Sequence, residues 1–304
     1  MPRSFADRLP LAHVPVDRDH ASRADPGVFD RPAMRFLVLE RGAALLDEHG
    51  GLALVERDAL PPDALLVYLG VTLEPAAGAP AGTPVSAAVV DHADEPYTPG
   101  PGGRFGDLRR LVATLGPRDA ALYAHALAMA NWHAAHPFSP RTGEPTVPAS
   151  AGWTRHGADG RELFPRTDPA VIVGVTDAAD RLLLGRNAAW PADRYSLLAG
   201  FVEPGESLEA AVVREVHEEA GIRVVEPRYL GSQPWPFPAS LMLGFRARVD
   251  PAAAELAPDG TEILDLRWFT RDEILAGVVA LPGRASIAHA IIADWAGAEI
   301  PDGS

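Results

Sequence analysis

The sequence predicts an α+β protein with two domains. A chain of 304 residues can form two ordinary domains, and 47% hydrophobic residues is enough to give each a core. Runs of strand character surround the helical stretches without the regular alternation of a doubly wound sheet. We therefore expect a smaller mixed α/β domain at residues 1–136, a linker at 137–165 and a second α+β domain at 166–304.

Short apolar runs separated by proline- and glycine-rich turns predict the strands of the first domain. They lie at residues 35–46, 52–55, 64–69 and 87–90. Helical periodicity follows at residues 105–114 and 117–136 and ends before Pro137. The region shows no pattern of catalytic or metal-binding residues, so we expect the first domain to be non-catalytic.

The second domain is expected to open with a buried strand, a turn and a hairpin partner at residues 170–175, 177–180 and 181–185. Further strands are expected at residues 224–230, 241–249 and 263–269, followed by an apolar-periodic helix at 285–296.

The central helix of this domain lies in the stretch from Gly200 to Ile222, GFVEPGESLEAAVVREVHEEAGI. Ser207 is a suitable N-cap, and Gly221 is suited to the position just past the C-terminal end. No helix breaker stands between them. The stretch therefore predicts a short helix preceded and followed by loops.

Three glutamates share one face of this helix. Glu215, Glu218 and Glu219 are related by i, i+3 and i+4, so their like charges repel, and the last two lie where the helix dipole disfavours anions. A divalent cation would offset both penalties, because converging carboxylate oxygens suit Mg²⁺ or Mn²⁺. The alternative for three glutamates taken alone is a solvated acidic face.

The complete spacing, Gly-x5-Glu-x7-Arg-Glu-Val-x-Glu-Glu-x-Gly-Ile, fills every fixed position of the Nudix box. The chain thus resembles the Nudix hydrolases. This resemblance implies an α/β/α sandwich whose loop–helix–loop holds Mg²⁺ or Mn²⁺ against a nucleoside diphosphate linkage.

A second motif, SQPWPFPAS, spans Ser232 to Ser240. Its three prolines alternate with Trp235 and Phe237, which predicts a stiff loop outside any central strand. Read alone, it could be a rigid corner packed by two aromatic rings. At this distance after a Nudix box it resembles the signature of the NADH pyrophosphatases, which implies substrate binding by Gln233, Trp235, Phe237 and Ser240.

The resemblance also implies individual roles. Glu215, Glu218 and Glu219 would hold the metal, Arg214 would orient a metal-binding glutamate, and Glu206 would belong to the same network. An i, i+4 pair with Glu218 is a compatible role for Arg214.

Two positions outside the helix are implied at the metal centre. Gly200 would permit close approach of the backbone to metal or phosphate. Glu262, in PDGTEILDLRWF, matches a metal-site glutamate by position, although its loop is acidic in any case.

Four apolar residues match family positions around the substrate. Phe201 and Phe164 would stack on the ring of the base, Phe164 from the partner subunit of a homodimer. Ile172 and Ala288 would line the pocket. Each phenylalanine could instead be an ordinary core residue.

The linker departs from the same family, in which two Cys-x-x-Cys knuckles hold a zinc ion. Ser139, Thr142, His156 and Asp159 stand where the four cysteines would be. Hydroxyls are poor zinc ligands, so we expect a ribbon without structural zinc. Before it, FxDLR and an alanine-rich helix ending in Trp132-His133 resemble the non-catalytic half of these enzymes.

Composition restricts the partners. A net charge of −14 gives no sign of a general nucleic-acid-binding surface. The chain lacks cysteine, a signal-peptide core and any apolar run of membrane-spanning length, so we expect a cytoplasmic protein with no membrane contact.

The function implied by the two motifs is hydrolysis of NADH or NAD⁺ to nicotinamide mononucleotide and AMP. The resemblance also admits removal of the NAD cap from RNA. Two alternatives are another nucleoside diphosphate such as ADP-ribose and a non-catalytic nucleotide sensor. The intact glutamates argue against the sensor, and the SQPWPFP loop argues against ADP-ribose.

Overall fold

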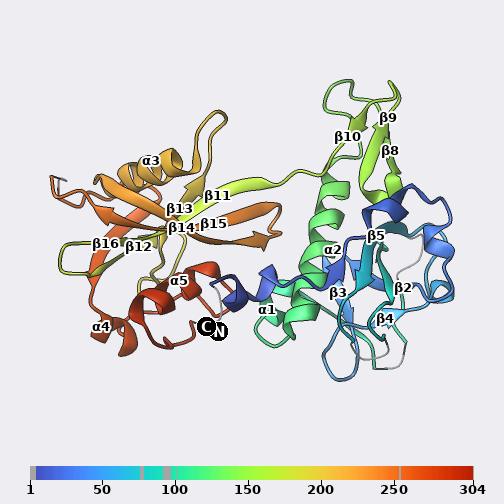
Figure 1. Cartoon of the computed structure of the whole chain (residues 1–304), viewed down its shortest axis with the longest axis horizontal. Coiled ribbons are helices and arrows are strands. Elements are labelled where there is room, and N and C mark those ends of the chain that lie inside the picture. The colour runs from blue at the N-terminus through green and yellow to red at the C-terminus, as the bar shows by residue number, and fades with distance from the viewer. Residues whose placement is uncertain (1–4, 76–78, 92–96, 101, 253–254, 304) are drawn as a thin grey trace. The chain divides into compact units, whose positions relative to one another are not determined.

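The computed structural model describes residues 5–75, 79–91, 97–100, 102–252 and 255–303. The chain divides into two compact units (Figure 1). The C-terminal unit comprises Met1–Ala12, Asp168–Pro234 and Ser240–Ser304, and the N-terminal unit comprises His13–Thr167 and Trp235–Ala239. Among the described residues, no helix is both long enough and apolar enough to cross a membrane.

A seven-stranded sheet forms the centre of the N-terminal unit, in the order β1-β5-β6-β2-β3-β7 with β4 paired to β2 (Figure 1). The strands are β1 (Val16–Asp17), β2 (Arg35–Glu40), β3 (Ala43–Leu46), β4 (Leu54–Val55), β5 (Leu65–Thr72), β6 (Pro84–Val89) and β7 (Arg104–Gly106). Helix α2 (Pro117–Ala135) joins this sheet through Tyr123, whose hydroxyl lies 2.7 Å from the carbonyl oxygens of Gly42 and Gly106 and accepts from Ala44 N–H.

Two expectations for this unit need correction. The run at 35–46 is two strands, because Arg41 and Gly42 have positive φ and make a hairpin turn between them. The run at 105–114 is mostly not helical. It begins in strand β7, and helix α1 covers only Leu108–Leu111, where the Asp107 side chain accepts from Arg109 N–H as the N-cap.

The linker forms a three-stranded antiparallel sheet of β8 (Thr146–Ala149), β9 (Thr154–Gly157) and β10 (Glu162–Leu163). Side-chain oxygens stabilise its two turns. Ser139 Oγ accepts from the N–H groups of Arg141 and Thr142 at 3.3 and 3.4 Å, and Asp159 Oδ1 accepts from Arg161 N–H at 3.1 Å. These hydrogen bonds stabilise the turns from within the linker itself. The absence of structural zinc stays a prediction.

A buried arginine also ties this small sheet to helix α2. Arg155 donates to Thr146 Oγ1 at 2.7 Å and to the Thr146 carbonyl at 2.8 Å, and its third nitrogen lies 2.8 Å from His133 Nδ1. Burial, reinforced by the Arg155 charge, lowers the pKa of His133 to about 4. The neutral imidazole can therefore accept from Arg155 at physiological pH.

The C-terminal unit is an α/β/α sandwich, as the sequence predicts. Its sheet runs β14-β15-β11-β12-β16, with β13 paired to β11, and β11 and β15 are parallel. The strands are β11 (Asp168–Thr176), β12 (Leu182–Asn187), β13 (Leu198–Phe201), β14 (Val224–Trp235), β15 (Ser240–Val249) and β16 (Ile263–Phe269). The helices are α3 (Leu208–Ala220), α4 (Arg271–Leu275) and α5 (Ile287–Ala296). Helices α3 and α5 pack on opposite faces over separate apolar clusters (Figure 1).

Strand β14 is longer than expected. It continues through Ser232 to Trp235, residues that the proline pattern assigns to a loop. The extension is possible because β14 is the edge strand of its sheet, where Pro234 needs no hydrogen-bond partner for its missing N–H.

The segment at residues 5–12 contributes to the core of the C-terminal unit. Leu9 is 2% exposed in the same apolar cluster as Ile172, Ile287 and Ile291, and Phe5 packs against that cluster. The segment therefore covers part of the sheet face on which α5 lies.

We expect Leu9→Ala to destabilise the C-terminal unit by about 2–5 kcal/mol, because it leaves a cavity in a packed cluster. Val278→Ala removes a side chain of the same unit that is 52% exposed and is the matched control. Scanning calorimetry measures both. If the Leu9→Ala protein unfolded at the same temperature as the wild type, the segment would add nothing to the stability of the core.

Candidate active site

Helix α3 begins and ends where its capping residues indicate. Ser207 Oγ accepts from Ala210 N–H at 3.2 Å, and Gly221, with φ of 71°, donates its N–H to the His217 carbonyl. Both ends are set by local chemistry. One face of the helix is thereby fixed toward strand β13.

Gly200 lies in β13, opposite Val171 of β11. A Cβ at this position would lie 2.0 Å from Cδ of Glu215 and 2.1–2.2 Å from its carboxylate oxygens. Any side chain at this position would force the Glu215 carboxylate or strand β13 to move, because the carboxylate occupies that space. The close approach expected at Gly200 is thus made by a side chain of α3.

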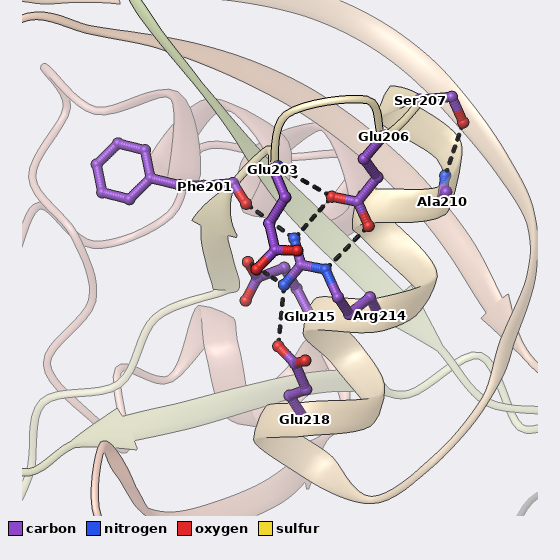
Figure 2. A network of polar contacts seen from close by, with 8 residues as sticks. All are labelled: Phe201, Glu203, Glu206, Ser207, Ala210, Arg214, Glu215 and Glu218. Carbon is purple, nitrogen blue, oxygen red and sulfur yellow. Dashed lines mark hydrogen bonds and ion pairs between the residues drawn. The ribbon is translucent and has the colours of Figure 1, made fainter.

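Arg214 is the centre of the polar network at the site (Figure 2). It donates to both carboxylate oxygens of Glu206, at 2.9 and 2.8 Å, and to the Phe201 carbonyl at 2.9 Å. The same guanidinium donates to Glu215 and Glu218 at 2.8 and 2.9 Å. The expected pair with Glu218 and the expected contact with Glu206 are both present.

The pKa values of two carboxylates in this network, Glu206 and Glu215, are shifted in opposite directions. Hydrogen bonds from Arg214 hold the pKa of Glu206 below its usual range. Burial raises the pKa of Glu215, and the opposing effect of Arg214 is smaller. Glu206 therefore acts as the charge partner of Arg214, and Glu215 lies in a drier environment beside Gly200.

Glu219 is the most buried of the three helix glutamates. Glu219 is only 6% exposed. Burial, together with the charges of Glu215 and Glu262, raises its pKa to about 8. It accepts a hydrogen bond from the Ala199 main chain, but Oε2 is buried with no partner among the described residues. A buried unpaired carboxylate oxygen costs free energy unless a cation or donor satisfies it.

The oxygen donors at this site fit a hard divalent cation. The charges of Glu215 and Glu262 both act on Glu219, and Oε2 of Glu219, which has no partner among the described residues, is the acceptor that such an ion would satisfy. Among the described residues, no three His, Asp or Glu side chains already converge as a metal cluster. One reason is that Arg214 binds an oxygen each of Glu215 and Glu218.

Glu262 is held by a turn that the sequence reading missed. Asp259 Oδ1 accepts from the N–H groups of Thr261, Glu262 and Ile263 at 2.6, 2.8 and 3.2 Å. The Glu262 carboxylate lies 3.5 Å from Asn187 Nδ2. The available signal was the Asp-Gly-Thr turn sequence, because aspartate commonly accepts from the N–H two residues on.

The two aromatic residues expected to stack on the base are open to solvent. Phe201 ends β13 in the C-terminal unit and is 59% exposed, and Phe164 follows β10 in the N-terminal unit and is 65% exposed. Such exposure is unfavourable for a large apolar ring, so neither is an ordinary core residue in this chain.

The two expected pocket-lining residues and Gln233 are buried. Ile172 and Ala288 are 5% and 2% exposed and belong to the cluster on the α5 face. Gln233 is fully buried; its amide donates to the Ala285 carbonyl and accepts from Ile287 N–H, at 2.8 and 2.7 Å. In this structure Gln233 therefore fixes the start of α5, and both ends of its amide are used.

The remaining residues of the second motif are divided between the units. Trp235 and Phe237 belong to the N-terminal unit, and their rings meet edge to face at 5.0 Å. Ser240 starts β15 in the C-terminal unit, paired with Asp168.

Comparison with known families identifies two domains. The NUDIX domain matches residues 165–294. The NADH pyrophosphatase-like rudimentary NUDIX domain matches residues 34–132. The first match contains the Arg214 network, and the second contains most of the N-terminal sheet.

Similar curated proteins carry related names. "NAD-capped RNA hydrolase NudC" of Mycobacterium tuberculosis is 50% identical over 206 residues, which are 64% of this chain and 66% of that protein. The protein of that name from Stutzerimonas stutzeri is 42% identical over 194 residues, 63% of this chain and 67% of the relative. Human "NAD(P)H pyrophosphatase NUDT13, mitochondrial" is 36% identical over 210 residues, 64% of this chain and 59% of the relative.

The match to the mycobacterial relative spans slightly less than two thirds of that protein's length. The two domain matches occupy most of the described chain, and the Stutzerimonas relative extends the likeness over two thirds of its own length. The chain belongs to the Nudix hydrolases, in the branch that carries an NADH pyrophosphatase-like N-terminal domain.

Proposed function

We propose that this protein hydrolyses the pyrophosphate bond of NADH or NAD⁺ and releases nicotinamide mononucleotide and AMP. The observation that carries the proposal is the buried Oε2 of Glu219, which has no hydrogen-bond partner in the described parts of the chain and lies within a complete Nudix box. A buried carboxylate oxygen of this kind does not stabilise a helix, but it can bind the cation that an anionic substrate needs. The relatives named for NAD-capped RNA and NAD(P)H support the substrate class.

The proposed cofactor is Mg²⁺ or Mn²⁺, held by Glu215, Glu218, Glu219 and Glu262. When bound, the ion polarises the phosphate oxygens and lowers the pKa of a coordinated water. Arg214, at the middle of α3, joins this helix to the Glu206 loop and to the end of β13 through its contacts with Glu206 and the Phe201 carbonyl. Gly200 leaves room for the Glu215 carboxylate.

Base recognition is assigned to the exposed rings. Phe201 offers an open aromatic face at the end of β13, and stacking on a base contributes about 1–3 kcal/mol. The exposed ring of Phe164 suits the same role from the partner subunit of a homodimer. We place this activity in the cytoplasm, in keeping with a chain that has no cysteine.

The NAD cap at the 5′ end of RNA is the second proposed substrate, because relatives in two bacterial genera are named for it. The net charge of −14 does not oppose it, since recognition of the cap alone needs few phosphate contacts. ADP-ribose has the same linkage and the adenine base but lacks the nicotinamide ring, so it separates recognition of nicotinamide from phosphate chemistry.

Parallel hydrolysis assays test the proposal. NADH, NAD⁺, ADP-ribose and NAD-capped RNA are incubated with the whole chain and Mg²⁺ or Mn²⁺, and products are separated by chromatography. We expect nicotinamide mononucleotide and AMP from NADH, with a kcat/KM at least about 10-fold above that for ADP-ribose. Equal or better efficiency on ADP-ribose would overturn the substrate assignment.

A further inference from the structure

The Trp235–Ala239 segment has few backbone N–H groups with which to form hydrogen bonds. Pro236 and Pro238, like Pro234 before them, have no N–H, so the backbone offers mainly carbonyl acceptors. Phe237 N–H is used within the segment, where it donates to the Trp235 carbonyl at 2.7 Å. A fixed conformation therefore requires donors from another part of the chain.

Asn131 supplies two such donors. It lies on α2 of the N-terminal unit, and its Nδ2 donates to the carbonyls of Pro236 and Pro238, each at 3.0 Å. Because both partners can only accept, they fix the orientation of the amide: its nitrogen must face them. One side chain thus uses both of its N–H groups on carbonyls that flank Phe237.

Arg109 holds the ring between those carbonyls. Its guanidinium lies 4.2 Å from the centroid of the Phe237 ring, within the range of a cation–π contact. Its own position is set by the first turn of α1, where Asp107 accepts from Arg109 N–H at 2.8 Å and Leu108 is fully buried. This accounts for three residues of the FxDLR motif: a cap, a core residue and a cation placed on Phe237.

We propose that Asn131 and Arg109 are positioning residues. Together they form a clamp through which the N-terminal unit fixes the WPFP segment, Trp235–Pro238, for binding of the dinucleotide. The inference rests on the proposed function, since the segment matters for catalysis only if it contributes to substrate recognition. It also gives the non-catalytic domain a task. Neither residue belongs to the carboxylate cluster of α3, so we expect the clamp to act on substrate affinity and to leave the chemical step largely unchanged.

Two variants and a control test the clamp in the full-length chain. Asn131→Asp keeps the size of the side chain and replaces both donors with an oxygen that repels the two carbonyls. Arg109→Leu removes the cation from the Phe237 ring and leaves the amide bonds in place. Arg110→Leu makes the same change at the adjacent exposed arginine of α1, whose side chain forms no hydrogen bond, ion pair or cation–π contact with any described residue.

Steady-state kinetics on NADH and hydrogen exchange measured by mass spectrometry are the two readouts. For Asn131→Asp we expect KM to rise about 10-fold with kcat within about 2-fold, and a smaller rise for Arg109→Leu. Peptides covering residues 232–243 should exchange faster in both variants, with protection of β11 and α3 unchanged. The control should match the wild type in both readouts.

Unchanged KM and unchanged exchange at 232–243 in both variants would overturn the clamp. A fall in kcat without a change in KM would also contradict it, because it would place these residues in the chemical step. If the wild-type chain hydrolyses no dinucleotide, the proposed function fails, whereas the exchange measurement still decides whether the clamp exists.

Discussion

Replacing Glu219 with glutamine is expected to lower turnover of NADH by at least about 100-fold while the metal-free protein becomes more stable. The activity falls because the variant loses a charged oxygen at the position where Oε2 now lies buried, with no partner among the residues that the structure describes. The stability rises because the same carboxylate opposes folding whenever it is ionised. A residue that was merely structural would not show both effects together.

The stability gain depends on pH in a defined direction. The pKa of Glu219 is about 8 in the folded chain and about 4.3 in an unfolded one. A carboxyl with a raised folded pKa contributes its full stability below the unfolded value, and this contribution is lost as pH rises through the folded value. The melting temperature of Glu219→Gln should therefore exceed that of the wild type more at pH 8.5 than at pH 5, by at least about 3 °C in chelator.

Glu209→Gln is the matched control, since Glu209 is an exposed glutamate in the first turn of the same helix. It should leave turnover and the pH dependence of the melting temperature unchanged. Calorimetry in chelator at the two pH values measures the stabilities, and chromatography of the products measures turnover. A Glu219→Gln protein that is less stable than the wild type at pH 8.5 would mean that the carboxylate supports the fold.

Gly200→Ala is expected to reduce kcat/KM by about 100-fold and to lower the melting temperature of the C-terminal unit. The added methyl group would overlap the Glu215 carboxylate, with 2.0 Å between Cβ and Cδ. The carboxylate or strand β13 must then move. Since Gly200 does not have a positive φ, the effect comes from steric overlap and not from backbone strain.

Gly116→Ala provides the comparison, because a Cβ at Gly116 would meet no atom within 4 Å. It should cost less than about 1 kcal/mol and leave activity unchanged. Kinetics on NADH and calorimetry of both variants check the prediction. Wild-type activity in Gly200→Ala would show that the Glu215 carboxylate need not lie against β13.

Local chemistry explains what the sequence predicted well. The caps at Ser207 and Gly221 act within one turn of the helix, so the ends of α3 follow from the residues themselves. The shared face of Glu215, Glu218 and Glu219 follows from helical periodicity alone. The edge strand β14 was harder to predict, because proline is compatible with a strand only when one side of it is unpaired.

Contacts between distant parts of the chain could not be read from the sequence. Leu9 follows two charged residues, Asp7 and Arg8, in the sequence, and only tertiary packing places it in the cluster around Ile287. Gln233 belongs to a substrate motif, yet its amide is used by the start of α5, 52 and 54 residues away. The partners of Asn131 are more than 100 residues away, so no local pattern marks it.

Proton release on Mn²⁺ binding tests the central assignment, that Glu219 is a metal ligand. With a pKa of about 8, Glu219 is mostly protonated at pH 7 in the metal-free chain and must lose that proton to bind a cation. Titration calorimetry at pH 7 in two buffers of different ionisation enthalpy should show about one proton released per ion bound by the wild type. The Glu219→Gln variant should bind weakly and without this release; equal affinity and equal proton release in the two proteins would contradict the assignment.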